Sequence, residues 1–491
     1  MIRVIIIFLL STFQLHSQAV LSDYYMQWIG GYDNYPDYGY GLNVIDFNNG
    51  SVSVDVYDTD VNLWIDDAGS VITDTMGQIA AVTNGCYIMD RQLSIIEGGD
   101  TLNGDDYYYR NYCERGLRYP ALQSSYFIPR KDGYRLIHAD KNRELIGPPV
   151  TAKVYCTDVH DQRVISKKIL LDSIYTGGRF FLKPLGLEGD FILIVIPYHT
   201  NIFETYKMEN DSFSLLQKNT VGPEINTSTE GDFSQVAFSS AGDMIAINND
   251  KYGLMLYDFD IDSGVISNHR SYSYSTTSVI SGLCFSPSDQ YVYVTNGEHI
   301  YQIDIMTSPE DPLIHDYGNQ YIPAPDGWPI GIGAMLTGPD CRIYVAPRST
   351  TNYMHVIHNP DEQGEGAGLE KHIELPMNVY HDFPNVPNLF ATCDSTIAWE
   401  ITSAIDELSI SVDTELHIYP NPTASSITIE LDMSSAGTIR VYDVMGALVY
   451  DYTKEKGVHS IDIDMTDWET GTYYVMYHTV GGIVQSRVVK M

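Results

Sequence analysis

Basic residues are scarce in this 491-residue chain: 28 lysines and arginines stand against 64 aspartates and glutamates, and the formal net charge is −36. So negative a chain is repelled by the phosphates of nucleic acids and by anionic lipid surfaces, and we expect neither as a partner. Long apolar runs are missing as well. No stretch reaches the roughly 18 residues that span a bilayer, so we expect no transmembrane segment.

The motifs of several common enzyme classes are also missing. The sequence contains no His-Glu-x-x-His zinc motif, no Gly-x-Ser-x-Gly hydrolase elbow, no Walker-type phosphate loop and no Gly-x-Gly-x-x-Gly fingerprint. Aspartate and glutamate are so common that spacing alone does not single out a catalytic pair. We therefore assign no catalytic, cofactor-binding or metal-binding residue from motifs.

The N-terminus has the pattern of a secretory leader. The basic start, Met1-Ile-Arg3, precedes an apolar run over residues 4–10, and Ser17-Gln-Ala19 places small residues at positions −3 and −1 of a cleavage site. We predict a signal peptide over residues 1–19, with cleavage before Gln18 as an alternative. No cysteine lies near this site, which argues against an N-terminal lipid anchor.

Helical periodicity is almost absent from the rest of the chain. Short Val, Ile, Tyr and Phe runs alternate with Gly, Asp, Asn and Ser turns about every ten residues, a pattern typical of antiparallel β structure. The same region also contains a longer repeat. In segments about 50 residues apart, equivalent positions are occupied by Phe238-Ser, Phe285-Ser and Leu336-Thr. A repeat of this length predicts the blades of a β-propeller.

The blades of a propeller bury their faces only against neighbouring blades, so the repeat predicts a closed ring. Residues 254–264 and 300–305 are predicted to include the third strands of their blades. The region 20–393 has room for about seven blades, with six or eight as alternatives. The predicted fold class is all-β.

The C-terminal region 415–491 carries several short motifs. They are Tyr419-Pro420-Asn421-Pro422, the turn glycines Gly446 and Gly471, Tyr473, and a basic end that includes Lys490. They resemble the type A C-terminal sorting domain of cargo of the type IX secretion system of Bacteroidota. The resemblance implies a small β-sandwich that the secretion machinery recognises, followed by surface attachment or release. A generic immunoglobulin-like adhesion module is the alternative.

Parts of the central region resemble a secreted Bacteroidota propeller family, notably residues 82–88, 97–102 and 338–345. This resemblance implies a surface location and no particular activity. It also implies that the strand around residues 42–47 closes the ring beside residues 388–391. Residues 394–414 are acidic and polar, and we predict a linker there.

Six cysteines are an even number for a chain bound for an oxidising space, and none lies in a Cys-x-x-Cys pair. The propeller topology implied by the resemblance places Cys86 and Cys113 around a long turn in the first blade. It places Cys341 and Cys393 around the closing region. We expect disulfides in these two pairs. The other two cysteines lie in strand patterns and are expected as buried free thiols: Cys156 and Cys284.

Two segments invite a metal-site hypothesis. The alternating carboxylates of residues 258–264 suggest a calcium loop, but Gly264 falls at position 7 instead of 6 and His269 stands where an EF-hand has Glu. A hairpin turn is the favoured interpretation, calcium the weaker one, and we expect no other cofactor. His355 and His358 face opposite sides of a strand and cannot share one metal unless a bulge intervenes.

Tyrosine is abundant, with 38 residues, and it suits both strands and recognition surfaces. We expect most tyrosines to be structural. The run Tyr107, Tyr108 and Tyr109, beside two aspartates in a predicted loop, is the candidate exposed binding patch.

We therefore predict an exported protein, secreted or displayed at the outer-membrane surface, whose propeller binds a protein or a glycan without catalysis. The alternatives are a secreted hydrolase and a structural envelope or matrix component, since a fold does not fix a function. An enzyme should have a deep central pocket with carboxylates or histidines of shifted pKa, and a binder a broad aromatic or acidic face.

Overall fold

The computed structural model forms two compact units, residues 1–405 and 406–491. It describes residues 21–32, 40–57, 63–65, 69–100, 102–103, 106–117, 119, 123–142, 150–176, 180–197, 200–225, 233–249, 251–274, 280–307, 312–320, 330–379, 383–389, 393–399, 416–431, 437–442, 448–454, 456–466, 468–479 and 482–491. The predicted signal peptide and the greater part of the predicted linker lie outside these ranges.

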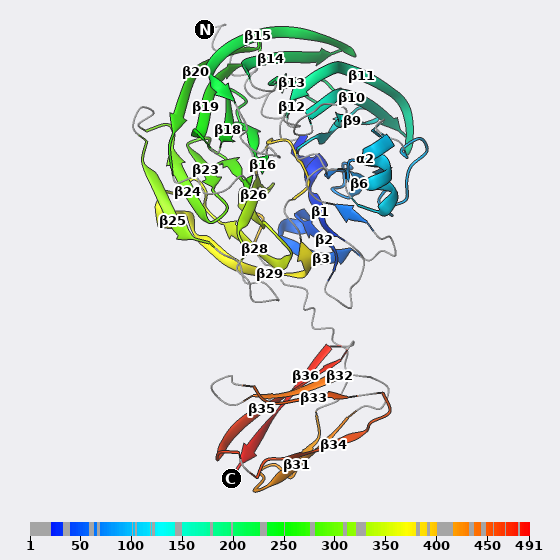
Figure 1. The fold of residues 1–491 in the computed structure, drawn as a ribbon, viewed down its shortest axis with the longest axis vertical. Coiled ribbons are helices and arrows are strands. Elements are labelled where there is room, and N and C mark those ends of the chain that lie inside the picture. The colour runs from blue at the N-terminus through cyan, green and yellow to red at the C-terminus, as the bar shows by residue number, and fades with distance from the viewer. Residues whose placement is uncertain are drawn as a thin grey trace. The chain divides into compact units, whose positions relative to one another are not determined.

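Strands of the first unit form a β-propeller, in which the described residues make seven antiparallel sheets around a ring (Figure 1). The strands of blades 1 to 3 are β1 (Gln27–Tyr32), β2 (Gly41–Asp46), β3 (Ser53–Tyr57) and β4 (Trp64–Ile65); β5 (Ser70–Thr73), β6 (Ile79–Thr83) and β7 (Ile88–Met89); β8 (Ser125–Arg130), β9 (Gly133–Asn142), β10 (Val150–His160) and β11 (Arg163–Thr176).

The strands of blades 4 to 7 follow in chain order. They are β12 (Phe181–Pro184), β13 (Phe191–Val195), β14 (Thr200–Glu209) and β15 (Ser212–Ile225); β17 (Val236–Phe238), β18 (Met244–Asn249), β19 (Gly253–Asp260) and β20 (Val265–Tyr272); β22 (Leu283–Phe285), β23 (Tyr291–Thr295), β24 (His299–Asp304) and β25 (Ile314–Asn319); β26 (Ile332–Thr337), β27 (Ile343–Pro347), β28 (Thr351–Ile357) and β29 (Leu369–Val379). Two short strands, β16 (Phe233–Ser234) and β21 (Ile280–Ser281), pair in parallel.

The predicted repeat and third strands are confirmed. Phe238 and Phe285 end the inner strands β17 and β22, Leu336 lies in the inner strand β26, and β19 and β24 are the third strands of their blades. The second strand of blade 4 reads as a continuous apolar run because blades pack on both of its faces. Every residue of β13, Phe-Ile-Leu-Ile-Val, is buried, whereas the rim strand β15 is mostly exposed or half-buried.

Ring closure differs from the prediction. β2 lies inside blade 1, and its Asn43 side chain exchanges two 3.0 Å hydrogen bonds with the backbone of Met377 in β29 of blade 7. The rings of Trp28, Phe47 and Tyr344 pack edge to face in the core between these blades, with centroids 4.8–5.6 Å apart. Among the described residues, blades 1 and 7 therefore close the ring through aromatic packing and hydrogen bonds.

Asn388, which was predicted beside residues 42–47, lies elsewhere. Residues 383–389, here called the strap, leave blade 7 and run along inner strands of other blades. Asn385 bonds Gly69 and Ser70 at the start of β5, and Asn388 donates to Phe238 of β17. The predicted closure was wrong because these contacts join residues more than 100 positions apart, which no local pattern encodes.

Residues 393–399, here called the clasp, correct the predicted linker. Ala398 donates its N–H to Gly50 and accepts one from Val52, so the clasp adds to the edge of blade 1. Arg342 of blade 7 donates to Ile397 and stands over the ring of Trp399. Residues 394–399, which the sequence assigned to the linker, therefore pack on the propeller.

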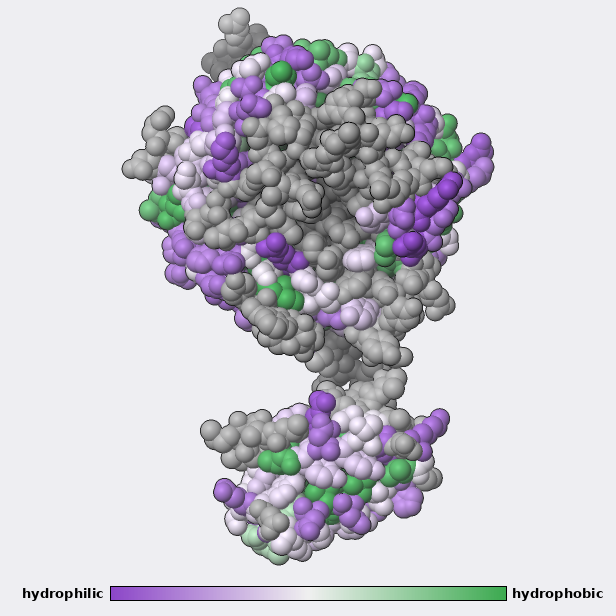
Figure 2. All heavy atoms as spheres, viewed as in Figure 1, coloured by the Kyte–Doolittle hydropathy of each residue, from purple (hydrophilic) through white to green (hydrophobic). Residues whose placement is uncertain are grey.

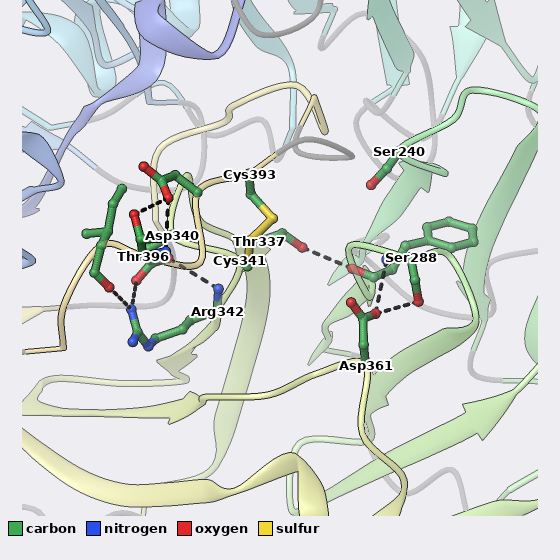
Figure 3. The surroundings of a disulfide bond; sticks show 12 residues. Ser240, Ser288, Thr337, Asp340, Cys341, Arg342, Asp361, Cys393 and Thr396 are labelled. Carbon is green, nitrogen blue, oxygen red and sulfur yellow. Dashed lines mark hydrogen bonds and ion pairs between the residues drawn. A yellow bond between two sulfur atoms is a disulfide. The ribbon is translucent and has the colours of Figure 1, made fainter. Parts of the chain in front are cut away.

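The clasp is fixed by a disulfide between Cys341 and Cys393 (Figure 3). A second disulfide joins Cys86 and Cys113. Both are the pairs expected from the resemblance, and Cys156 and Cys284 are buried free thiols. The Cys86–Cys113 bridge holds the short helix α2 (Asp106–Asn111) and the turns η4 (Cys113–Arg115) against Tyr119. Three more one-turn helices lie at η1 (Asp23–Tyr25), η3 (Asn48–Gly50) and η5 (Gly364–Ala367).

Removing the Cys341–Cys393 bridge is expected to lower the free energy of unfolding of the propeller. The bridge closes a loop of 52 residues, and the chain-entropy model gives about 4 kcal/mol for that length. Urea unfolding of the Cys341→Ser/Cys393→Ser protein measures the loss. An unchanged midpoint would contradict the assignment of the clasp as part of the propeller.

The second unit is a β-sandwich, as predicted. One sheet has the order β30-β31-β34 and the other β33-β32-β35-β36. Side chains from both sheets, among them Ile429, Val441, Val475 and Val488, form a buried cluster. The strands are β30 (Ile418–Tyr419), β31 (Ser426–Glu430), β32 (Gly437–Tyr442), β33 (Leu448–Lys454), β34 (Ser460–Asp464), β35 (Gly471–Thr479) and β36 (Gly482–Lys490).

Candidate functional site

Among the described residues, inner strands of blades 3 to 7 and the strap line a small cavity. Its volume is about 40 Å³, which has room for a few water molecules at most. Two glutamines close the wall: Gln123 exchanges hydrogen bonds with Val236, and Gln235 bonds Leu283 and Met335. The described residues that line the cavity include no carboxylate and no histidine.

A buried lysine holds the strap in place. The ammonium of Lys183 donates to the carbonyls of Ser240, at 2.8 Å, and of Ser239 and Asn388, both at 3.3 Å. Burial lowers the pKa of Lys183 to about 8. Nearby, burial raises the pKa of Asp289 to about 6, although its carboxylate accepts the backbone N–H groups of Ser240 and Ala241. In the described structure, both groups with a shifted pKa hydrogen-bond to backbone groups that join blades and strap.

The histidine pair does not form a metal site. The ring of His355 is fully buried, and its Nδ1 accepts the N–H of His372, so the proton must be on Nε2, which donates to the carbonyl of Gln320. His358 instead contacts Glu370, at 2.6 Å. Within the ranges given above, no three His, Cys, Asp or Glu side chains are grouped so that they could hold a metal ion.

The pKa of His355 predicts a loss of stability in mild acid. Burial lowers this pKa to about 4, from an unfolded value near 6.5, so the unfolded state binds the extra proton between these limits. The contribution of neutral His355 to the free energy of unfolding is therefore complete above pH 6.5. It falls by about 2 kcal/mol between pH 6.5 and 5. Urea unfolding at pH 6.5 and pH 5 measures the change in the free energy of unfolding. This change should be smaller for His355→Gln than for the wild-type chain, since Gln can donate and accept at the same positions without titrating. Equal differences would contradict the prediction.

The segment 258–264 is a hairpin turn, which is the favoured interpretation, and its carboxylates at Asp258 and Asp260 have partners. Asp258 pairs with Arg270 and accepts from Asn268, and Asp260 accepts the N–H groups of Asp262 and Ser263. These bonds account for the acidic pattern as turn and strand chemistry, so the segment gives no support to a calcium site.

The candidate tyrosine patch lies on α2. Tyr109 is half-buried and packs edge to face on Tyr87, with ring centroids 6.4 Å apart. The side chains of Tyr107 and Tyr108 lie outside the described part of the structure. On the described surface of the propeller in Figure 2, hydrophilic side chains dominate and apolar ones are scattered.

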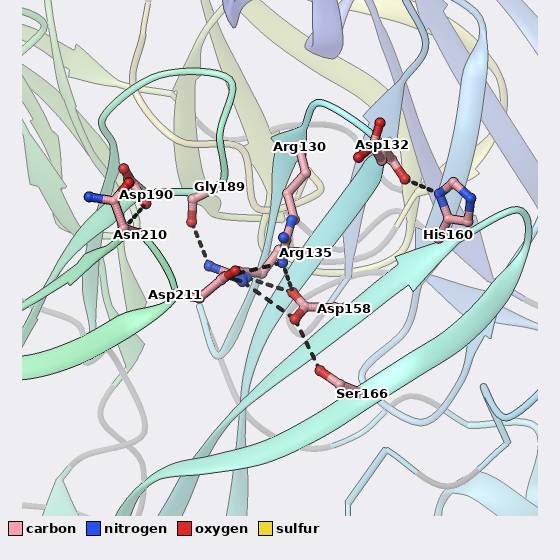
Figure 4. Close-up of polar contacts among 10 residues, drawn as sticks. All are labelled: Arg130, Asp132, Arg135, Asp158, His160, Ser166, Gly189, Asp190, Asn210 and Asp211. Carbon is pink, nitrogen blue, oxygen red and sulfur yellow. Dashed lines mark hydrogen bonds and ion pairs between the residues drawn. The ribbon is translucent and has the colours of Figure 1, made fainter.

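One polar cluster was missed by the sequence reasoning (Figure 4). The buried guanidinium of Arg135 on β9 contacts Asp158 at 2.7 Å, Asp211 at 2.5 Å and the carbonyl of Gly189 at 2.8 Å. Arg130 contacts the same two aspartates. Asp211 and Gly189 belong to blade 4, so the cluster joins it to blade 3.

The charges of this cluster stabilise one another. Burial alone would lower the pKa of Arg135, but its hydrogen bonds to Asp158 and Asp211 raise it. Burial would raise the pKa of Asp158, yet the two guanidiniums hold it below its usual value, and the hydrogen bond from Arg135 does the same for Asp211. Both aspartates therefore stay ionised at neutral pH. A groove of about 230 Å³ opens beside them.

Two motif residues of the sandwich form hydrogen bonds between its entry turn and its last strand. Asn421 donates to the carbonyl of Arg487, at 2.6 Å, and accepts the N–H of Val489, at 2.9 Å. Lys490 is buried, and its ammonium donates to the carbonyl of Ala424, at 2.7 Å. The entry turn and the C-terminus are thus joined. The Tyr419–Pro420 and Asn421–Pro422 peptide bonds in this turn are cis.

The remaining motif residues are spread through the sandwich. Tyr473 is buried against Trp468 and donates to the carbonyl of Glu469. Gly471 begins β35 opposite Lys490, and Tyr419 bonds Glu430 on the exposed side. Gly446 lies outside the described residues. Among the described residues, no helix has the length and apolar character needed to cross a bilayer.

Comparisons with solved structures give distant likenesses. A candidate 6-phosphogluconolactonase of Bacteroides fragilis matches with a TM-score of 0.41 and 11% identity, over 74% of this chain and 99% of its own. The β-propeller domain of Cps50 (Swd1) from Myceliophteria thermophila matches with a TM-score of 0.39 and 9% identity, over 63% and 87%. The propeller assignment rests on the seven sheets themselves.

Comparisons of sequence match parts of the chain. Ulvan lyase NLR42 of Nonlabens ulvanivorans is 33% identical over 102 residues, which make up 20% of this chain and 18% of the lyase, so the match spans less than a fifth of that relative. Residues 417–491 match the family model of the secretion system C-terminal sorting domain. The chain therefore ends in such a sorting domain, which marks it as type IX secretion cargo, destined for the cell surface or the medium.

Proposed function

We propose that the propeller of this exported protein is a binding module for a protein or a glycan outside the cell. The observation that carries the proposal is the small size of the cavity that the described inner strands line. Between these strands, the strap and two glutamines leave about 40 Å³. A ligand that this unit recognises would then bind on its outer surfaces, as expected for an adhesive or scavenging module.

The environment of the buried groups whose pKa is shifted also supports a binding function. Lys183 and His355 bond to backbone groups, and Asp289 accepts backbone N–H groups, so their pKa shifts follow from packing. Catalytic groups are shifted by burial too, but they face a pocket that admits a substrate. The acidic composition keeps such a module soluble and selective against anionic surfaces.

The proposal includes boundaries for the signal peptide, the propeller and the linker. Residues 1–19 would be the signal peptide that admits the chain to the periplasm, residues 20–399 the propeller, and residues 400–414 the linker to the sorting domain. Contacts between the secretion machinery and the sandwich would then carry the chain across the outer membrane. Tyr107, Tyr108 and Tyr109, on a helix held by the Cys86–Cys113 bridge, are one proposed contact patch.

The test is a binding screen with the purified full chain, on a glycan array and on proteins extracted from the surface of co-occurring cells. We expect saturable binding to at least one ligand, without release of a cleaved product. Product release from a bound glycan or peptide would support the hydrolase alternative. Absence of saturable binding on both panels would contradict the proposal.

A further inference from the structure

The groove between the outer strands of blades 3 and 4 has the features of a ligand site. Its volume is about 230 Å³, and its lining includes Lys168 and Ile169 from β11, Met208 from β14, and Asp211 and Phe213 from the β14–β15 hairpin. We propose that this groove binds one acidic sugar residue, a uronate or a sulfated sugar, of an extracellular glycan. The inference rests on the proposed binding function and names its site and ligand class.

One hydrogen-bond acceptor in the groove is held in place before a ligand arrives. Arg135 and Arg130 both contact Oδ1 of Asp211. The other oxygen, Oδ2, has no hydrogen-bond partner among the described residues, and the side chain is 55% exposed. A carboxylate that is ionised and oriented in this way is suited to accept the hydroxyl protons of a sugar without losing further side-chain freedom.

A matching donor lies across the groove. Lys168 is exposed, and in the described part of the chain no hydrogen bond or ion pair engages its ammonium. Its position on β11 places it on the same sheet face as Asp158, because Lys168 pairs with Cys156 and Ser166 pairs with Asp158. An ammonium at this edge can pair with a carboxylate or sulfate of the ligand.

The rest of the wall is apolar. Phe213 stacks on Tyr206, with planes 8° apart and centroids separated by 5.2 Å, so its ring is held in a fixed orientation. Leu170 and Met208 complete this side of the groove, and Leu170 packs against the same apolar cluster as Phe213. The C–H face of a sugar ring packs on such surfaces, while its hydroxyls turn toward the polar side.

Local charge selects the class of ligand. Arg130 and Arg135 form ion pairs with Asp158 and Asp211, and these charges neutralise one another, while the nearby Asp190 carboxylate accepts the N–H of Asn210. In a chain whose net charge is −36, Lys168 is the lining cation that has no ion pair among the described residues. It disfavours a basic peptide side chain and favours an acidic ligand.

Calorimetric titration of the full chain tests the proposal, with polygalacturonate and dextran sulfate as acidic probes and dextran as the neutral one. We expect saturable binding to at least one acidic probe and at least about tenfold weaker binding to dextran. Lys168→Glu should weaken binding of the acidic probe by about tenfold or more. Lys371→Glu, which makes the same charge change at an exposed position of β29 in blade 7, should change it less than about twofold.

Three other outcomes would overturn the inference. Equal loss in both lysine variants would mean that general electrostatics, and not the groove, attracts the probes. Binding that neither variant changes would place the site elsewhere. If the wild-type chain ignores both acidic probes but binds another ligand in the screen above, this inference fails while the binding function stands; if it binds nothing, both fail.

Discussion

A chain that ends at Ser411 is expected to fold its propeller and yet remain in the periplasm, whereas the full chain reaches the cell surface. The sandwich cluster draws on residues 416–488, and the cluster that closes the propeller ring draws on residues 21–397, so each unit has its own core. Removal of the sorting domain should therefore leave the propeller intact and abolish nearly all export. The measurement is protease accessibility and fractionation in cells that carry the type IX system.

A point variant separates loss of the fold from loss of the segment. Val475 is fully buried between the two sheets, and Val475→Asp places an unpaired charge there, which should unfold the sandwich and block export as the truncation does. Lys456→Gln, at an exposed position of the same unit, should be exported normally. A truncated chain that still reaches the surface would mean that the sandwich is an interaction module and not an export signal.

Arg135→Met is expected to lower the free energy of unfolding of the propeller by about 3–5 kcal/mol. The substitution keeps most of the apolar stem, but it leaves the carboxylate of Asp158, only 9% exposed, with Arg130 as its remaining cation. It also removes the donor to Gly189 of blade 4. The loss is measured by urea unfolding of the full chain, followed by tryptophan fluorescence.

The matched control lies in the same blade. Arg163 pairs with Glu97 at 3.5 Å, and both side chains are more than 60% exposed, so Arg163→Met should cost less than about 1 kcal/mol. Adding Asp158→Asn to Arg135→Met should restore part of the stability, because it removes the uncompensated charge. Equal effects of the two arginine variants would contradict the role assigned to the cluster.

The parts of the fold that repeat were accessible from the sequence. Phe238 and Phe285 recur because each inner strand packs in the same surroundings. The period of the repeat and the fixed order of strands in a blade therefore predicted their positions. The contacts that break the repeat were not accessible. Asn388 bonds Phe238 and Asn43 bonds Met377 over separations of 150 and 334 residues. Such pairs leave no local pattern, which is why the closure and the start of the linker were wrong.

The candidate site shows the same division. The motif around Asn421 predicted a sorting domain, and the structure adds that this asparagine holds the last strand. Arg135, by contrast, lies in an ordinary strand sequence, Tyr-Arg-Leu-Ile, and its partners come from three other strands and turns. A basic residue followed by the apolar pair Leu136-Ile137 is the sequence signal that could have drawn attention to it.

The most direct test of the account is a fusion of residues 416–491 to a soluble reporter that is already delivered to the periplasm. The sandwich has its own core, and its motif residues tie the entry turn to the last strand, so it should act without the propeller. We predict that the reporter appears at the cell surface or in the medium, and only in cells with an intact type IX system. A reporter that stays in the periplasm of those cells would contradict the assignment of this unit as the export signal.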